Sequence, residues 1–428
     1  MVTSKDIYSE LEWRGLIHQV TDDRLGSMLA AERFVLYCGF DPTADSLHLG
    51  GLIQLLGLRR MQVAGHRPIA VMGGGTGLIG DPSGRESERT LLAPEAIEAN
   101  IAAIRGQAER IVDFSPGSSQ AILVNNADWL RPLKLTDFLR DIGKHFSVNQ
   151  MVARDSVRNR LENREQGISY TEFTYMLLQS YDFLHLHREH NCRLQIGGSD
   201  QWGNITYGIE LIRKVAGADA YGLTSPLIKG LGGAKMGKSV GGNVWLDPAR
   251  TSPYRFYQHF INVDDARVGQ FLRFFTFLGR DAIDELDKQV KKSPQRREAQ
   301  RVLAREVTAL VHGPDEAARA ERASQALFGR QIAELGEREL LEVLSDAPSS
   351  NRPPSELAGG MPLIDLLIHA GLATSRKNAR EFIGGGGVYV NNTKQTDADR
   401  SVSEGDLLHG RYLVLRRGKK NHHLVSFG

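Results

Sequence analysis

The chain has 428 residues, 41% hydrophobic and 24% charged, a composition typical of a soluble protein of two or three domains. Its net charge of +2 neither indicates nor excludes a nucleic-acid partner, but residues 361–428 hold ten Lys and Arg against six Asp and Glu. The two cysteines, Cys38 and Cys192, have no spacing typical of a disulfide framework or a zinc site. No apolar run reaches the ~18 residues of a membrane span. We therefore expect a cytoplasmic protein with no membrane partner and no protein-bound metal. Separately, we expect no DNA partner.

The first half of the chain alternates strand and helix patterns. Strand-like RFVLYCGF precedes helix-like HLGGLIQLLGLRRMQVAG, for which Asp45 or Ser46 is an N-cap candidate, and strand-like PIAVM follows. Further helices are expected over 94–114, 135–146, 170–190 and 202–217, and further strands over 120–126 and 192–197. This order predicts an α/β fold, a doubly wound and mainly parallel Rossmann-like domain over 1–224, which binds ligands at the carboxyl ends of its strands.

Strand patterns fade after Pro248, and helix patterns over 255–263, 266–279 and 295–313 predict an α-helical domain spanning 225–335. The stretch SDAPSSNRPPSELAGG is rich in Pro, Ser and Gly, so residues 336–360 are interpreted as a linker. Short helix patterns and strand-like GVYVNN and RYLVLRRGKKNHHLVSF then predict a small α+β domain over 361–428.

The segment GGAKMGKS, residues 232–239, matches the phosphate-loop pattern G-x-x-x-x-G-K-[ST]. A phosphate loop leads directly into a helix, whereas here VGGN follows and Pro248 and Pro253 come soon after. The six glycines between Gly230 and Gly242 instead predict a mobile loop that carries Lys235 and Lys238. A solvated basic loop without a ligand is the alternative interpretation.

His48 stands at the expected start of the first long helix, after a turn that contains Thr43. Helix N-termini attract anions through free N–H groups, and both side chains can donate hydrogen bonds to the same phosphate. A histidine in this position can equally serve as a helix cap or a packing residue.

Two short motifs carry a resemblance to class I aminoacyl-tRNA synthetases. HLGG at residues 48–51 and KMGKS at 235–239 resemble the His-x-Gly-His and Lys-Met-Ser-Lys-Ser signatures of that family, except that Gly51 and Gly237 replace a histidine and a serine. YCGFDPTADSLHLG, YTEFTYMLLQSYDFLHL and CRLQIGGSDQWGNI closely resemble the bacterial tyrosyl-tRNA synthetases, and this likeness extends over essentially the whole chain.

The resemblance implies a tyrosine site. Tyr37 and Asp182 would bind the phenol hydroxyl of the tyrosine substrate, and Asp81, Tyr175 and Gln179 would hold its ammonium group. Gln195 would contact the residues of the pocket without touching the substrate. Independently, the i, i+4, i+7 spacing of Tyr175, Gln179 and Asp182 puts three polar groups on one helix face. The alternative is that they merely decorate an amphipathic helix.

The resemblance also implies an ATP site, with Mg²⁺ bound to the ATP. Thr43, His48, Lys235 and Lys238 would form its catalytic set, and Arg85 and Arg89 would be weaker candidates for pyrophosphate or tRNA acceptor contacts. The full set of expected ATP-binding residues is Cys38, Gly39, Asp41, Thr43, His48, Gly50, Gly198, Asp200, Gln201, Lys235, Lys238 and Ser239. Cys38 can also be read as a small buried core residue.

The basic C-terminal region resembles a small RNA-binding fold found in a ribosomal protein and in bacterial tyrosyl-tRNA synthetases. Arg376, Lys377 and Arg380 on its helix would contact RNA backbone. The implied partners are L-tyrosine, ATP and tRNA(Tyr), together with a second copy of the chain in a homodimer.

Three other functions remain open from sequence. A tryptophan–tRNA ligase belongs to the same enzyme class, but Tyr37, Gln179 and Asp182 suit a phenol better than an indole. A non-catalytic RNA-binding factor on the same fold is supported only by Gly51 in place of the second histidine. A phosphate-loop NTPase is opposed by the residues that follow Ser239.

Overall fold

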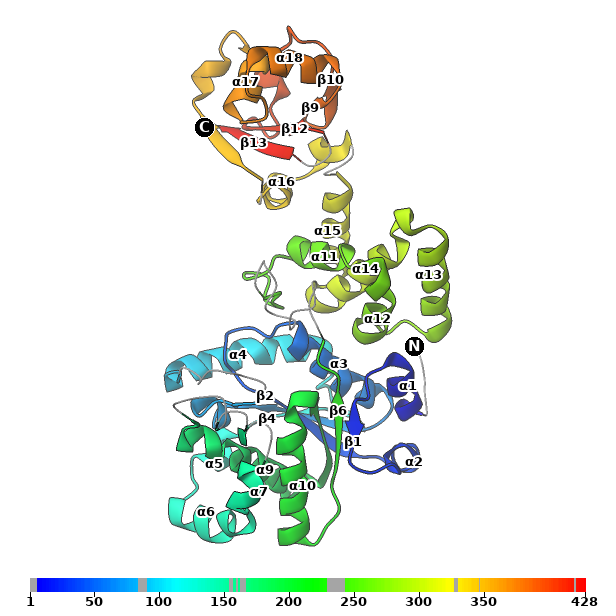
Figure 1. Ribbon diagram of the computed structural model, residues 1–428, viewed down its shortest axis with the longest axis vertical. Helices are drawn as coiled ribbons and strands as arrows, with labels where there is room; N and C mark the ends of the chain where they lie inside the picture. The colour runs from blue at the N-terminus through cyan, green and yellow to red at the C-terminus, as the bar shows by residue number, and fades with distance from the viewer. Residues whose placement is uncertain are drawn as a thin grey trace. The chain divides into compact units, whose positions relative to one another are not determined.

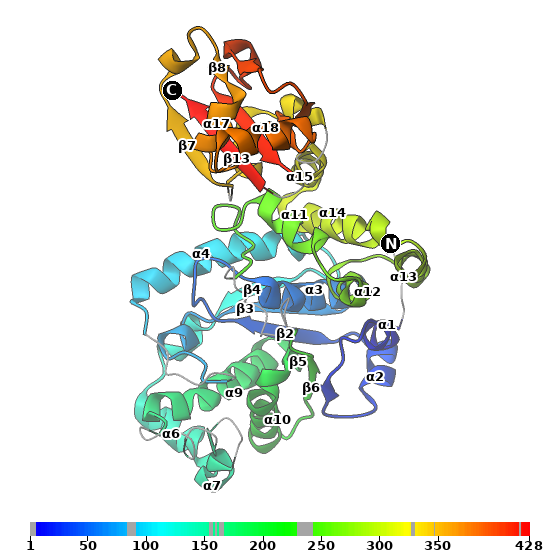
Figure 2. The same cartoon turned by 45° about the horizontal axis from the view of Figure 1, so that its top comes forward.

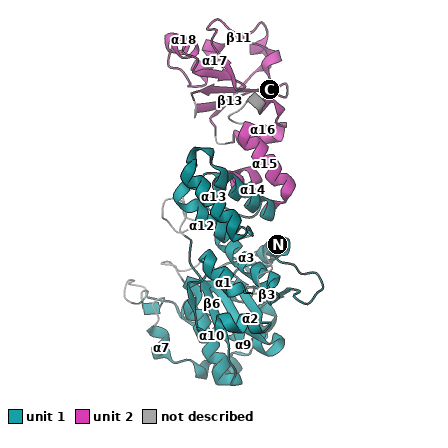
Figure 3. Ribbon diagram, turned by 90° about the vertical axis from the view of Figure 1, so that its right-hand side faces the viewer, with its two compact units in different colours: residues 1–252, 259–311 teal, residues 253–258, 312–428 magenta. Residues whose placement is uncertain are grey.

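The computed structural model describes residues 6–83, 91–153, 157–158, 161, 167–228, 243–326, 330–345, 347–418 and 421–428. The chain forms two compact units, one of residues 1–252 and 259–311 and the other of residues 253–258 and 312–428 (Figure 3). Within the described ranges, no helix is both long enough and apolar enough to cross a membrane.

The first unit is built on a six-stranded sheet in the order β1-β6-β5-β2-β3-β4. Five strands run parallel, and only β1 (Gln19–Val20) pairs antiparallel, with β6. The parallel strands are β2 (Val35–Phe40), β3 (Arg67–Met72), β4 (Ile122–Asn125), β5 (Cys192–Gly198) and β6 (Tyr221–Ser225). The strand order reverses between β2 and β5, which is where a doubly wound sheet opens a ligand crevice. The predicted fold class is confirmed.

Helices cover both faces of this sheet, which explains why its strands are almost continuously apolar. On one face lie α3 (Leu49–Val63) and α4 (Pro94–Ile111), and on the other lie α9 (Tyr170–His190) and α10 (Trp202–Ala216), as Figures 1 and 2 show. Helix α9 has the bounds expected from sequence. The Ser169 side chain caps its first turn by accepting from the Glu172 N–H, and Asn191 ends it in the left-handed conformation at φ 53°.

The predicted N-cap of α3 is wrong. The cap is His48 itself, because its Nδ1 accepts a hydrogen bond from the Gly50 N–H at 2.9 Å. Ser46 is buried, and its hydroxyl donates to the Leu47 carbonyl instead. The imidazole therefore satisfies one of the free N–H groups of the first turn.

Shorter helices complete the first unit: α1 (Ile7–Arg14), α2 (Leu25–Ala31), α5 (Ala127–Leu130), α6 (Leu135–Asp141) and α7 (Val148–Val152). The chain after β6 contains α11 (Pro253–Ile261), α12 (Asp265–Phe275), α13 (Arg280–Lys292) and α14 (Glu298–His312).

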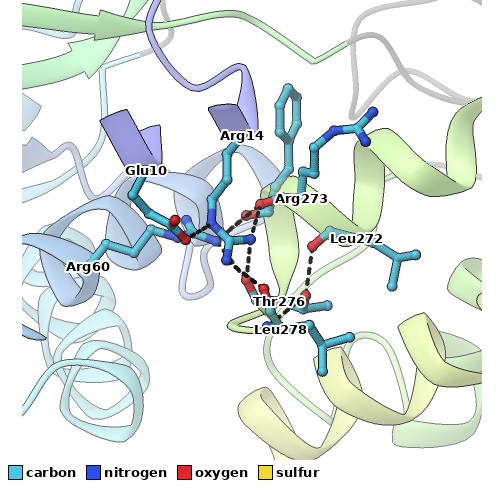
Figure 4. A network of polar contacts seen from close by, with 8 residues as sticks. Glu10, Arg14, Arg60, Leu272, Arg273, Thr276 and Leu278 are labelled. Carbon is cyan, nitrogen blue, oxygen red and sulfur yellow. Dashed lines mark hydrogen bonds and ion pairs between the residues drawn. The ribbon is translucent and has the colours of Figure 1, made fainter. Parts of the chain in front are cut away.

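Two buried arginines attach α1 and α3 to the end of α12 (Figure 4). Arg14 donates to the carbonyls of Arg273 at 2.9 Å and Leu278 at 2.7 Å, and it pairs with Glu10 at 2.7 Å. Arg60 donates to the Thr276 carbonyl at 3.0 Å, and burial lowers its pKa to about 9. The last carbonyls of a helix lack partners within the helix and carry partial negative charge. The two arginine side chains supply hydrogen-bond donors and positive charge to these carbonyls.

The second unit contains a five-stranded sheet in the order β10-β9-β12-β13-β7. Its strands are β7 (Ser349–Arg352), β9 (Val388–Val390), β10 (Thr393–Gln395), β12 (Tyr412–Arg417) and β13 (Asn421–Phe427). A smaller sheet pairs β8 (Met361–Pro362) with β11 (Ser401–Val402). The helices are α15 (Pro314–Ala326), α16 (Glu337–Val343), α17 (Leu363–His369) and α18 (Arg376–Gly384). Apolar residues of α17 and α18 pack with Leu413, Leu415 and Val425 in one core, as expected for a small α+β fold.

The expected linker over 336–360 is wrong. This segment contains α16, which buries Leu340 fully, and β7, which pairs parallel with β13. Its polar composition was misleading because an edge strand is held by backbone hydrogen bonds and needs no apolar side chains. The expected helical domain over 225–335 is also divided, since residues 259–311 belong to the first unit and 312–335 to the second.

Candidate active site

The candidate site lies at the carboxyl ends of β2, β3, β4 and β5, around the point where the strand order reverses. Tyr37 and Cys38 belong to β2, and Asp41 follows directly after that strand. Gln195 of β5 stands opposite Tyr37 in the strand register. Tyr37 and Gln195 are both buried.

Three polar side chains of α9, Tyr175, Gln179 and Asp182, form hydrogen bonds with residues at this edge of the sheet. Tyr175 donates its hydroxyl to Asp41 Oδ2 at 3.0 Å, and Asp41 Oδ1 accepts from Thr76 Oγ1 at 2.9 Å. Gln179 donates to Gln201 Oε1 at 3.2 Å. Asp41, expected only near ATP, is therefore hydrogen-bonded to residues of the tyrosine end.

Two hydrogen bonds hold the Asp182 carboxylate. Its Oδ1 accepts from Trp129 Nε1 at 2.7 Å, and its Oδ2 accepts from Asn126 Nδ2 at 2.9 Å. Burial raises the pKa of Asp182 to about 7, although both hydrogen bonds act in the opposite direction. The carboxyl group therefore changes its charge near neutral pH.

Two buried polar atoms on the neighbouring strands β2 and β5 have no hydrogen-bond partner among the described residues. They are the Tyr37 hydroxyl and Gln195 Oε1. Burial, together with the charge of Asp182, raises the pKa of Tyr37 well above its ordinary value, so the phenol stays protonated and can donate. Because unpaired buried polar groups are costly, this arrangement suits a ligand that brings a hydroxyl to the same place.

A second group of polar side chains surrounds Asp81, which is buried. Asp81 Oδ2 accepts from Gln201 Nε2 at 2.6 Å. Gln201 Oε1 and Gln179 Oε1 both accept from Asn204 Nδ2, at 3.2 and 3.0 Å. These links orient one carboxylate and two amides for a cationic group, although Gln201 was expected among the ATP-binding residues.

The opposite end of the site is open. Gly39, Thr43, His48 and Asp200 are exposed, in contrast to the buried tyrosine end. A Cβ at Gly50 would lie 2.7 Å from His48 Cε1, so a larger residue there would displace the His48 ring. Cys38 is buried and its pKa rises to about 12, so it is a neutral thiol, while Gly198 is buried beside Asp200.

Lys235, Lys238 and Ser239 lie outside the described residues, as do Arg85 and Arg89. The chain that follows the lysine segment is nevertheless fixed against the start of α3. Trp245 forms a backbone bridge with His48, and the Leu246 N–H donates to the Leu47 carbonyl at 2.9 Å. Trp245 is six positions after Ser239 in the sequence.

Sequence reasoning missed Asn126 and Trp129. Asn126 is 1% exposed and connects Asp182 to the turn after β3, because its Oδ1 also accepts from the Gly75 N–H at 2.7 Å. Both residues follow β4, and the rule that ligands gather at strand carboxyl ends was a usable signal for them.

The expected RNA-binding side chains lie on α18 of the second unit. Lys377 and Arg380 are exposed. Arg376 is exposed too, but both of its hydrogen bonds to the Asp365 carboxylate are 2.7 Å long, so its charge is already paired.

Comparisons with known proteins identify the family. The model of class I tRNA synthetases (W and Y) matches residues 29–329, and the model of the tyrosine–tRNA ligase SYY-like C-terminal domain matches residues 339–425. A tyrosine–tRNA ligase from Roseiflexus castenholzii is 53% identical over 98% of this chain and 99% of its own, and one from Opitutus terrae is 52% identical with the same coverage. The crystal structure of a C-terminally truncated mitochondrial tyrosyl-tRNA synthetase from Aspergillus nidulans superposes with a TM-score of 0.69 at 32% identity, covering 76% of this chain and 94% of that one. The chain belongs to the class I tRNA synthetases of the tryptophan and tyrosine group.

Proposed function

We propose that this chain is a tyrosine–tRNA ligase, which activates L-tyrosine with ATP and then transfers the tyrosyl group to tRNA(Tyr). Relatives that are more than 50% identical over nearly the whole chain carry that name. The structural observation that carries the proposal is the buried Tyr37 hydroxyl without a partner among the described residues, close to the Asp182 carboxylate.

Tyr37 and Asp182 would hold the phenol hydroxyl of the substrate, with Gln195 supporting Tyr37 from the neighbouring strand. Phenylalanine would leave both polar groups buried and unpaired, which is how such a site rejects it without an editing step. Tryptophan offers a larger ring and an N–H group in another position, so this pair favours tyrosine.

Asp81, Tyr175 and Gln179 would hold the substrate ammonium group. The Asp81 carboxylate supplies the opposite charge, and its hydrogen bond from Gln201 fixes its orientation. Asp41 keeps the Tyr175 hydroxyl in place. The same side chains orient the substrate carboxylate toward the open end, where ATP would bind.

At the open end, Cys38, Gly39, Gly50, Gly198 and Asp200 would contact the ribose and adenine of ATP. Thr43 and His48 would bind the β- and γ-phosphates, helped by the N-terminus of α3. Lys235, Lys238 and Ser239 would reach the same phosphates, which is consistent with the backbone bridge between Trp245 and His48 a few residues further along the chain. Mg²⁺ would arrive with ATP and neutralise part of the phosphate charge.

Activation needs no protein nucleophile. The tyrosine carboxylate oxygen forms a bond to the α-phosphorus while the bond to the bridging oxygen breaks, and pyrophosphate leaves with the electron pair. The protein contributes positioning and stabilises the charge that develops on the leaving group. A ribose hydroxyl at the 3′ end of the tRNA then attacks the tyrosyl carbonyl, and AMP leaves.

We also propose a cytoplasmic homodimer. Exposed apolar side chains occur on or beside α6, α7 and the start of α9, and exposed apolar surface is a feature of protein interfaces. They are Leu135, Leu139, Val148, Val152, Leu161 and Tyr170. Lys377 and Arg380 of the second unit would contact tRNA backbone.

The decisive experiment measures exchange of labelled pyrophosphate into ATP by the purified protein. We expect exchange that depends on tyrosine, not on phenylalanine or tryptophan, followed by charging of tRNA(Tyr). Exchange with tryptophan in place of tyrosine would establish the tryptophan enzyme, and no exchange with either would favour a non-catalytic RNA-binding factor.

A further inference from the structure

A cavity of about 440 Å³ lies within the second unit. It is bounded by the end of α16, the turn after α17, the end of β12 and the start of β13. Its volume falls within the range of about 300–1,000 Å³ that is usual for sites of small organic groups.

An arginine and a histidine line this cavity from the same face of the sheet. Leu415 stands opposite His423 and Arg417 stands opposite Asn421 in the β12–β13 register, so Arg417 and His423 lie on the face covered by α17 and α18. Arg417 is held in place, because it donates to the Leu372 carbonyl at 2.7 Å and its guanidinium lies 4.9 Å from the Phe382 ring centre.

His423 supplies an unpartnered buried nitrogen. The residue is 6% exposed, and its Nε2 lies 2.9 Å from the Ser350 hydroxyl on β7. Its Nδ1 is buried and has no hydrogen-bond partner in the described part of the chain. Burial lowers the pKa of His423, so the imidazole is neutral at pH 7 and offers one donor or acceptor position to a ligand.

The surroundings of the cavity favour RNA. None of the described residues that line it is acidic. Leu372, on its wall, is three residues before Ser375, the N-cap of α18, and α18 exposes Lys377 and Arg380. RNA backbone held along α18 would therefore bring its bases close to the opening.

We propose that this cavity binds one unstacked base of the tRNA, with the guanidinium plane of Arg417 and the imidazole of His423 as its contacts. Proteins that recognise RNA by sequence commonly bind such splayed-out bases by stacking and by hydrogen bonds to the base edges. This inference rests on the proposed function, because it takes tRNA as the ligand.

The test uses the full-length protein with two variants. Ala370→Phe fills the cavity from the half-buried end of α17, and His423→Phe removes the hydrogen-bonding nitrogens while keeping a ring of similar shape. We expect each to raise the KM for a tRNA(Tyr) transcript roughly tenfold, the size of one lost base contact. Tyrosine-dependent pyrophosphate exchange should not change, and Ala358→Phe, an exposed alanine that does not line the cavity, is the matched control.

Salt dependence distinguishes a base contact from a phosphate contact. The two cavity variants should leave the slope of log affinity against log salt concentration unchanged. Lys377→Ala should make this negative slope shallower by about 1. An unchanged KM for tRNA in Ala370→Phe, or a reduced salt slope in the cavity variants, would overturn the inference. If His423→Phe lowers the unfolding temperature, its KM for tRNA no longer tests the cavity. The KM of Ala370→Phe then decides whether the cavity binds a base. Absence of exchange by the unaltered protein would refute the proposed function instead.

Discussion

The two ends of the candidate active site differ in how firmly the chain itself fixes them. At the tyrosine end, Tyr37, Tyr175 and Asp182 are at most 4% exposed, and hydrogen bonds from three different segments hold the carboxylates. At the nucleotide end, Thr43, His48 and Asp200 are exposed, and Trp245 forms a backbone bridge with His48. A buried, prearranged end can select a substrate through the cost of unpaired groups, whereas an exposed end can act on charge that develops only during the reaction.

The largest effect is expected from His48→Asn. Asparagine still accepts from the N–H groups of the first turn, so the helix cap is retained while the imidazole Nε2 is lost. We expect kcat for adenylate formation to fall roughly 100-fold, because one donor to the developing charge disappears, while the dissociation constant of tyrosine is unchanged. Single-turnover kinetics and equilibrium titration measure the two quantities separately. A parallel loss of tyrosine affinity would show that the two ends are not independent.

At the opposite end, Asp182→Asn should act mainly on tyrosine binding. The phenol hydroxyl would exchange a charged acceptor for a neutral one, and hydrogen bonds to charged groups contribute about 1.5–3 kcal/mol. We expect the KM for tyrosine to rise at least tenfold, with a smaller effect on the KM for ATP. Pyrophosphate exchange at varied tyrosine and ATP concentrations measures both values. Equal changes in both KM values would contradict the division into two ends.

The same variant should change how stability depends on pH. Burial raises the pKa of Asp182 from 3.8 to about 7, so the folded chain binds an additional proton between these values. The associated stability is fully present below pH 3.8 and is lost as pH rises through about 7, by up to about 4 kcal/mol. The unaltered protein should therefore lose stability from pH 5 to pH 8, whereas Asp182→Asn should not show this loss. The difference in the free energy of unfolding, variant minus unaltered, should rise from pH 5 to pH 8 in urea unfolding. The exposed Asp128→Asn is the control, and it should give the same difference at both pH values.

Trp129→Phe should have a smaller effect that depends on pH. Losing the indole N–H removes one of the two hydrogen bonds that lower the pKa of Asp182, so that pKa should rise further. We expect the KM for tyrosine to increase a few-fold at pH 7 and less at pH 8.5, where the carboxyl group is ionised in both proteins. An increase that is the same at both pH values would point to packing, since Trp129 also stacks on His185 at 4.3 Å.

The fold was more predictable than the site contacts, for physical reasons. The strands β2, β3 and β5 and the helix α9 follow from periodic apolar patterns, and these patterns reflect burial directly. Strand β7 could not be predicted, because SSNR is stabilised by backbone pairing with β13 and has no apolar pattern. The hydrogen bond from Asn126 to Asp182 joins residues 56 positions apart, and no local pattern in either segment specifies it.

Gly51→Ala should have the smallest effect, and it tests whether the open end tolerates change. Gly51 stands where the related signature has its second histidine, and a Cβ there would lie 3.1 Å from Leu47 Cδ2. Alanine should favour the helix by up to about 1 kcal/mol, whereas Leu47 is buried and must shift by a few tenths of an ångström. These opposing terms should leave the free energy of unfolding within about 1 kcal/mol and the KM for ATP within about twofold of the unaltered values. A large rise in the KM for ATP with unchanged stability would show that the first turn of α3 is as tightly fitted to its ligand as the tyrosine end.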